Sequence, residues 1–145
     1  MINSKPMLIA LNIKADEVST SLGIDACYMG RDSTGKTYEP SPDTDYIRWD
    51  LIPNDIQRRS VKGNETDFMQ NGIYQCTVFI GKSSGSNPII KAPEITDAVQ
   101  AAFTQNLKLE YDNQTCRITR CSPDVALANE THEYKVLSIY FDCLK

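Results

Sequence analysis

Two stretches of the chain carry apolar residues at the three- and four-residue spacing of an amphipathic helix. The first spans Ser4 to Ser21, with Ser4 placed as an N-cap and Gly23 placed to end the helix. The second has Pro93 in its first turn, where a missing amide costs nothing, and carries the stripe Ile95, Ala98, Val99, Ala102 and Phe103. Whether Ile89 to Lys91 extend this helix is left open, because Pro93 would then lie in its interior.

Four other stretches predict strands, because they alternate apolar and polar residues or are rich in β-branched and aromatic side chains. They cover residues 46–52, 73–80, 115–121 and 133–143. Ile24 to Met29 is a shorter, fifth candidate. The order of elements favours an α+β fold, with an antiparallel or mixed β-sheet of four to five strands and two helices packed on it.

The intervening segments have the composition of loops. Glycine, proline and small polar residues fill residues 30–45 and 81–87. After Pro53, residues 54–71 are polar and without a clear period, which predicts a long loop. The length fits a single domain over residues 1–145.

Composition and charge exclude several classes of protein. Apolar residues make up 41% of the chain and charged residues 23%, as in folded globular domains. The net charge of −4 lacks the basic excess of a general nucleic-acid binder. The apolar run from Met7 to Leu11 is too short to span a membrane, so we expect no membrane association and a protein that stays in a reducing cytoplasm until assembly.

The cysteines and the single histidine form no pattern typical of a metal site. Five cysteines stand apart without a CxxC pair, and His132 is the only histidine in the sequence. Zinc ligands, in contrast, come at short and regular spacings. Three of the cysteines lie in strand-like runs, which predicts small buried side chains. We therefore expect no metal, no cofactor and no catalytic residue.

Residues 30–37 read GRDSTGKT and match the P-loop pattern of nucleotide-binding proteins. In that interpretation the backbone around Gly30 and Gly35 cradles phosphates. Lys36 then contacts the terminal phosphates and Thr37 holds magnesium. A P-loop needs a helix directly after it, however, and the two prolines that follow prevent one. We interpret the motif as a surface turn and keep nucleotide binding as a disfavoured alternative, which Lys36→Ala would test.

A basic cluster and an acidic segment lie in two of the predicted loops. Arg58, Arg59 and Lys62 are close together in the 54–71 loop, and residues 124–133 are acidic. Three interpretations of the basic cluster remain open: a solvated loop, a contact with acidic neighbours in an assembly, or a contact with DNA phosphates in a channel.

The order of several short motifs resembles the phage tail terminator family. Tyr46-Ile47-Arg48-Trp49, followed by Leu51-Ile52-Pro53, resembles a strand of that family. Asn71 to Phe79 (NGIYQCTVF) resembles its next strand, and Thr96 to Phe103 (TDAVQAAF) resembles a helix. The resemblance covers nearly the whole chain and ends on two strands, residues 115–121 and 134–141.

The resemblance implies a structural protein of a phage or prophage, and no enzyme. Members of the family close into a six-fold ring on the end of the tail tube, where the ring stops tube growth and offers a surface for joining the head. The implied partners are further copies of the chain in a homo-hexameric ring, the tail tube protein and the head–tail connector protein. DNA only passes through the ring. The implied location is the virion tail, after assembly in the host cytoplasm.

A ring of identical subunits joins one patch of a subunit to a different patch of the next. The candidates for this subunit interface are basic on one side and acidic on the other: Arg58, Arg59, Lys62, Glu130 and Glu133. Two alternatives of other kinds remain. One is another head–tail connector or head-closure protein, and the other is the nucleotide binder discussed above.

Overall fold

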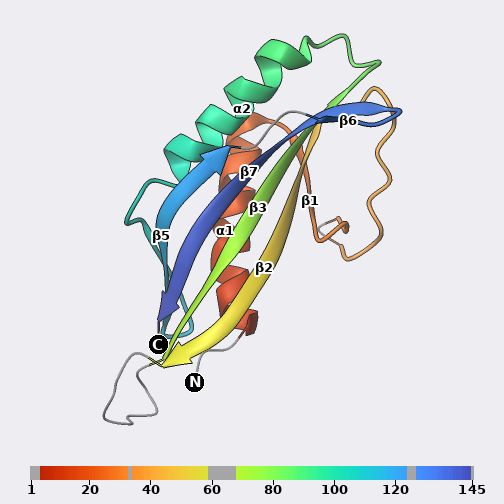
Figure 1. Cartoon of the computed structure of the whole chain (residues 1–145). Helices are drawn as coiled ribbons and strands as arrows, with labels where there is room; N and C mark the ends of the chain where they lie inside the picture. Colours follow the sequence, from red (N-terminus) through yellow and green to blue (C-terminus); the bar gives the residue numbers. More distant parts are fainter. Residues whose placement is uncertain (1–3, 33, 59–67, 124–126, 145) are drawn as a thin grey trace.

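The computed structural model describes residues 4–32, 34–58, 68–123 and 127–144, with the backbone alone for residues 4, 53–58, 68 and 69. The elements are α1 (Ser4–Leu22), β1 (Asp25–Tyr28), β2 (Tyr46–Arg58), β3 (Phe68–Gly81), α2 (Pro88–Ala102), β4 (Lys108–Tyr111), β5 (Gln114–Pro123), β6 (Leu127–Ala128) and β7 (His132–Leu144). The strands form one sheet in the order β1-β2-β3-β7-β5-β4, and β6 pairs with β7. Within the described chain, β1 and β2 pair in parallel and the other neighbours pair antiparallel. Figure 1 shows the curled sheet and the two helices beside it.

One face of the sheet and both helices enclose a hydrophobic core. The central strands send alternate side chains into it, among them Trp49, Tyr74 and Phe141, each 1% exposed or less. The helical stripes predicted from the sequence form the other wall, with Leu11 of α1 and Val99 of α2 fully buried. Among the described residues no helix packs on the opposite face, called here the open face, and the loop before β2 covers one end of it through Tyr38 and Thr44.

The fold is α+β, but the prediction of four to five strands is too low, because the described residues already form a sheet of seven. The two missed strands, β4 and β6, are four and two residues long and mostly exposed, which is too short for an alternating pattern to indicate a strand. A two-residue hairpin loop joins β4 to β5 at Asp112 and Asn113, which have φ angles of 50° and 60°. Such a loop matches the twist of paired strands, so this Asp-Asn pair was the signal for the missing strand.

β2 and β3 are longer than predicted, and the loop between them is shorter. β2 continues through Pro53 and β3 begins at Phe68, so the prediction of a loop over all of residues 54–71 is wrong. β1 pairs with β2 only as far as Trp49. Beyond that residue β2 is an edge strand, which tolerates a proline, and the register shifts between Pro53 and Ile56.

α2 settles the question that the sequence left open, because Ile89 to Lys91 belong to it. Asn87 caps the helix, and its side-chain oxygen accepts a hydrogen bond of 3.2 Å from the Ile89 amide. Pro93 therefore lies inside the helix. It removes one helical hydrogen bond close to the N-terminus, a cost that the cap and the buried stripe offset.

Candidate assembly interface

The open face of the sheet carries a row of aromatic side chains across three strands. The register places Tyr46, Phe79 and Tyr134 next to one another on β2, β3 and β7. The Tyr46 and Phe79 rings stack with their centres 4.6 Å apart, and the Phe79 and Tyr134 rings lie 5.2 Å apart. Cross-strand aromatic pairs stabilise a sheet. This end of the open face is therefore a rigid, half-buried surface.

Further along the strands the same face opens into a hollow of about 330 Å³, called here the sheet hollow. Ile52, which is 46% exposed, and Ile73 give it an apolar lining. The guanidinium carbon of Arg120 lies 3.9 Å from the centre of the Tyr140 ring, a cation–π contact that holds a positive charge at the hollow. Oδ1 of Asn71, which also lines it, is buried and has no hydrogen-bond partner within the described structure.

A second apolar surface, called here the apolar corner, lies where α2 begins beside β6 and the start of β7. Ile89 is 81% exposed and Leu127 is 53% exposed. Both line a groove of about 480 Å³ together with Glu133. A cluster of large, solvent-exposed apolar side chains is typical of an interaction surface. Tyr134 at this corner and Tyr140 in the sheet hollow are six residues apart on β7, which is a distance of about 20 Å along the strand.

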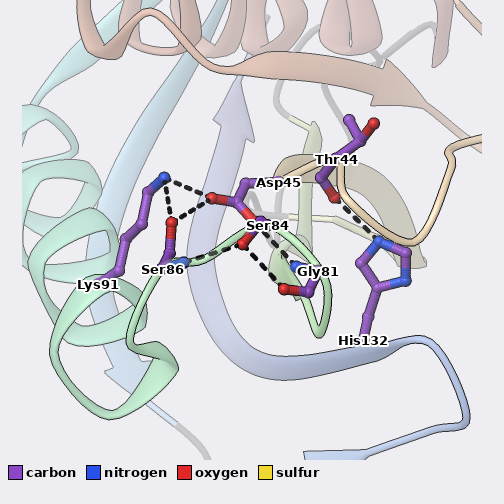
Figure 2. A network of polar contacts seen from close by, with 7 residues as sticks. All are labelled: Thr44, Asp45, Gly81, Ser84, Ser86, Lys91 and His132. Atoms are coloured by element: carbon purple, nitrogen blue, oxygen red, sulfur yellow. Dashed lines mark hydrogen bonds and ion pairs between the residues drawn. The ribbon is translucent and has the colours of Figure 1, made fainter.

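A polar network fixes the loop before β2 to the turn before α2 (Figure 2). Asp45 pairs with Lys91 Nζ, and its Oδ2 accepts a hydrogen bond of 3.1 Å from Ser86 Oγ. Its other oxygen accepts one of 2.9 Å from the Gly81 amide. These contacts join three segments that are distant in the sequence.

The same network holds a serine and a lysine close together. Ser86 Oγ lies 3.2 Å from Lys91 Nζ, within reach of a base. Burial acts to raise the pKa of Asp45, but hydrogen bonds from Lys91 and the Gly81 amide outweigh it and hold that pKa below its ordinary value. The carboxylate is charged at neutral pH and accepts hydrogen bonds from both Lys91 and Ser86, so these two side chains are held in structural contacts. The network of Asp45, Gly81, Ser86 and Lys91 is structural, and it is called here the clasp.

We expect Asp45→Asn to lower the free energy of unfolding by about 1–3 kcal/mol at pH 7, because Lys91 loses its charged partner. The pKa of Asp45 is lower in the folded protein than in the unfolded chain, where it is near 3.9. The carboxylate therefore stabilises the fold fully at pH values above the unfolded pKa, and this stabilisation is lost as the pH falls through the folded pKa. Urea unfolding of both proteins at pH 7 and pH 3 should therefore show a smaller difference at pH 3. The exposed Asp97→Asn is the control, and a difference that does not change with pH would contradict the assignment.

His132, the single histidine, is the first residue of β7 and is 3% exposed. Its Nε2 lies 2.9 Å from the carbonyl oxygen of Thr44, and its Nδ1 lies 2.8 Å from Thr131 Oγ1. Both ring nitrogens are thus occupied by structural contacts next to the clasp, and Figure 2 shows the contact with Thr44. The ring adds a second tie between β7 and the loop before β2.

The GRDSTGKT segment folds into a turn closed on its own aspartate. Asp32 Oδ1 accepts hydrogen bonds from the amides of Thr34 and Lys36, at 2.9 and 3.1 Å. In a P-loop, amides of this kind face phosphate. The chain continues without a helix to β2. Nothing in this geometry favours nucleotide binding by the four candidate residues, Gly30, Gly35, Lys36 and Thr37.

The predicted interface residues occupy different parts of the structure. Arg58 is the last residue of β2, whereas Arg59 and Lys62 lie outside the described residues. Glu130 is exposed in the turn before β7. Glu133 is half-buried in β7 and lines the apolar corner.

Arg58 and Glu133 lie at opposite ends of the sheet. Arg58 pairs with Phe68, and the neighbouring Met69 pairs with Leu144 at the end of β7. Glu133 is eleven residues before Leu144, which is about 36 Å along a strand. Arg58 and Glu133 therefore cannot meet within one chain, and any contact between them joins two copies.

The sequence patterns missed the sheet hollow and the apolar corner. Tyr140 stands at a polar position of its predicted strand, and an aromatic residue at such a position is the signal that points to the hollow. Arg120 shares the alternation of Cys116 and Ile118, and only the register shift between Ile118 and Arg120 brings it to the hollow. The sequence does not show whether Ile89 belongs to the loop or to the helix, so the exposure of its side chain could not be predicted. Both surfaces depend on which strands are neighbours, and alternation along one strand does not contain that information.

Comparison with known families identifies the chain. The profile described as phage tail terminator protein matches residues 15–139, which is most of the sequence. The chain belongs to the phage tail terminator family. This match confirms the resemblance drawn from the strand motifs. Phage tail terminators are structural proteins, so the chain has a structural role in phage tail assembly and is a component of the virion tail.

Solved structures share the fold of this tail terminator. One chain of 16% sequence identity superposes with a TM-score of 0.73, over 100% of this chain and 98% of that chain. At such low identity the likeness shows the fold alone. No protein of curated function matches the sequence significantly. Among the side chains that the structure describes, no three His, Cys, Asp or Glu residues gather as metal ligands, and no described helix is long and apolar enough to cross a membrane.

Proposed function

We propose that this phage tail terminator closes into a homo-hexameric ring that caps the tail tube, stops its growth and presents the surface that joins the head. The family membership over residues 15–139 carries this proposal. The proposed partners are further copies of the chain, the tail tube protein and the head–tail connector protein, with DNA only passing through the ring. Assembly takes place in the host cytoplasm, and no reaction is catalysed.

The shape of the subunit supports head-to-tail contacts. A ring needs two complementary patches that lie apart on each subunit. The sheet hollow and the apolar corner meet this requirement, because both have apolar linings. Arg120 and Asp142 line the hollow, where Asp142 is paired with Arg117, and Glu133 lines the corner. In the proposed contact, the corner of one copy fills the hollow of the next.

The chemistry of the two surfaces fits such a contact. Ile89 and Leu127 would leave water against Ile52 and Ile73, which contributes about 3–6 kcal/mol before the cost of association. Arg120 would face Glu133, which fixes the orientation more than it adds affinity. This stabilisation is small for one protein interface, so we expect weak association between copies in solution. We expect the ring to close on the tube end, because the tube adds further contacts.

Single substitutions at the corner test the proposed contact. We expect Ile89→Asp to weaken association between copies at least tenfold, because it places a charge in the apolar contact. The fold should be retained, since an aspartate in the first turn of a helix is favourable. Ile13→Asp is the matched control, because Ile13 is 56% exposed on α1 and lies at neither surface. Equal effects of the two substitutions in sedimentation velocity experiments would contradict the contact.

Capping is tested directly with tail tubes. Purified tail tube protein is allowed to polymerise with and without this protein, and tube lengths are measured by electron microscopy. The proposal predicts shorter tubes with additional density at one end, and Ile89→Asp should restore the longer tubes. Unchanged lengths together with bare tube ends would refute capping.

A further inference from the structure

Two cysteines face each other inside the core. Cys116 of β5 and Cys143 of β7 are direct partners in the antiparallel register. Their Sγ atoms are 3.0 Å apart, and both residues are 0% exposed. Direct partners on antiparallel strands have Cα atoms about 4.5–5.5 Å apart, which is within the span of a disulfide. The two sulfurs can therefore be joined without moving the backbone.

This pairing is specific to Cys116 and Cys143. The other three cysteines pair in register with residues of other types: Cys27 with Arg48, Cys76 with Trp49 and Leu137, and Cys121 with Ile139. All five thiols are free in the structure. The position of each cysteine thus predicts which pair can react and which cannot.

The surroundings favour reaction at one of the two sulfurs. The Cys116 thiol donates a hydrogen bond to Cys143 Sγ, and Gln114 Nε2 lies 3.3 Å from the same sulfur. These donors, the Cys116 thiol first, lower the pKa of Cys143 below its ordinary value, and a thiolate is the form of cysteine that reacts. Cys143 also lies one residue before the end of β7, where strand ends open locally.

We propose that Cys116 and Cys143 form an oxidation site, a dithiol that hydrogen peroxide converts to a cross-strand disulfide. The Cys143 thiolate attacks one peroxide oxygen, and the O–O bond breaks. Hydroxide departs as the leaving group, and Cys143 becomes a sulfenic acid. Cys116 then loses its proton and attacks that sulfur, the S–O bond breaks, and the second oxygen leaves as water. Two thiols and one peroxide give one disulfide and two waters.

The disulfide ties the end of the last strand to β5. It removes conformational freedom from the unfolded chain and so raises the stability of the folded subunit. A reducing cytoplasm keeps the pair as thiols during assembly. On the proposed location, the bond would form only after the host cell opens, when the finished tail meets oxidants.

The full-length native protein is treated with hydrogen peroxide, denatured, and its thiols are counted with a thiol reagent. The count should fall from the five cysteines of the sequence to three. Trypsin under non-reducing conditions should release residues 109–117 linked to residues 136–145, with the loss of two hydrogens. The thermal midpoint should rise by several degrees and return after dithiothreitol treatment.

Two variants separate this pair from the other cysteines. Cys143→Ser should keep all four of its thiols under the same treatment, whereas the control Cys121→Ser should fall from four to two. A native protein that keeps five thiols, or a linked peptide that contains any other cysteine, would overturn the proposal. If Cys143→Ser does not fold, the peptide map of the native protein decides by itself. The outcome does not depend on ring formation, so it is distinguishable from a failure of the proposed function.

Discussion

Replacing Trp49 by alanine is expected to lower the free energy of unfolding by about 3–5 kcal/mol, the largest stability effect that we predict. Trp49 is 1% exposed, and its ring centre lies 5.4 Å from that of Tyr74 and 5.8 Å from that of Phe103. Its Nε1 donates a hydrogen bond of 3.1 Å to Ser19 Oγ. One side chain thus joins β2 to β3, to α1 and to the segment that follows α2.

Guanidinium chloride unfolding followed by circular dichroism measures this loss, because the variant lacks the tryptophan fluorescence. Ile52→Ala is the control, three residues along the same strand and 46% exposed. It should change the stability by less than about 1 kcal/mol. A loss below about 1 kcal/mol for Trp49→Ala would show that the core is not organised around this residue.

Reversing the charges of Arg58 and Arg59 is expected to weaken assembly strongly. Arg58→Glu with Arg59→Glu should weaken association between copies at least tenfold, since attraction to the acidic end becomes repulsion. The folded subunit should keep its stability. Light scattering during chromatography measures the association.

A second reversal, which leaves Glu133 free to face Arg120, makes this experiment specific. Glu130→Lys should weaken association on its own and restore it when mixed with the Arg58 and Arg59 variant. Reversal of two other basic residues, Arg31→Glu with Lys36→Glu in the exposed 30–37 turn, should have no effect. Absence of rescue would show that the two clusters do not face each other.

The helices and the longest strands could be predicted from the sequence because their periods are long and regular. The stripe of α1 and its end at Gly23, with a φ of 65°, match the prediction closely. The alternation in β7 puts Leu137, Ile139 and Phe141 on one face of the strand, and in the structure all three are buried in the core. Short strands such as β4 carry too few residues to show any period.

The rest could not be predicted because it depends on contacts between distant residues. The sheet hollow combines Ile52, Ile73 and Tyr140, which meet only through the register of β2, β3 and β7. Cys116 and Cys143 are partners for the same reason. The turn over residues 30–37 is a different case. The prolines after it predicted the lack of a following helix, but not that Asp32 accepts hydrogen bonds from the loop amides.

Light scattering coupled to size-exclusion chromatography, at rising protein concentration and with and without tail tubes, tests the central claim most directly. Negative-stain images of any large species, and of the tube ends, complete the measurement. The account predicts a species of about six times the mass of one chain with a central hole, formed in solution or on the tube end. A monomer at every concentration, with no ring on tube ends, would contradict it.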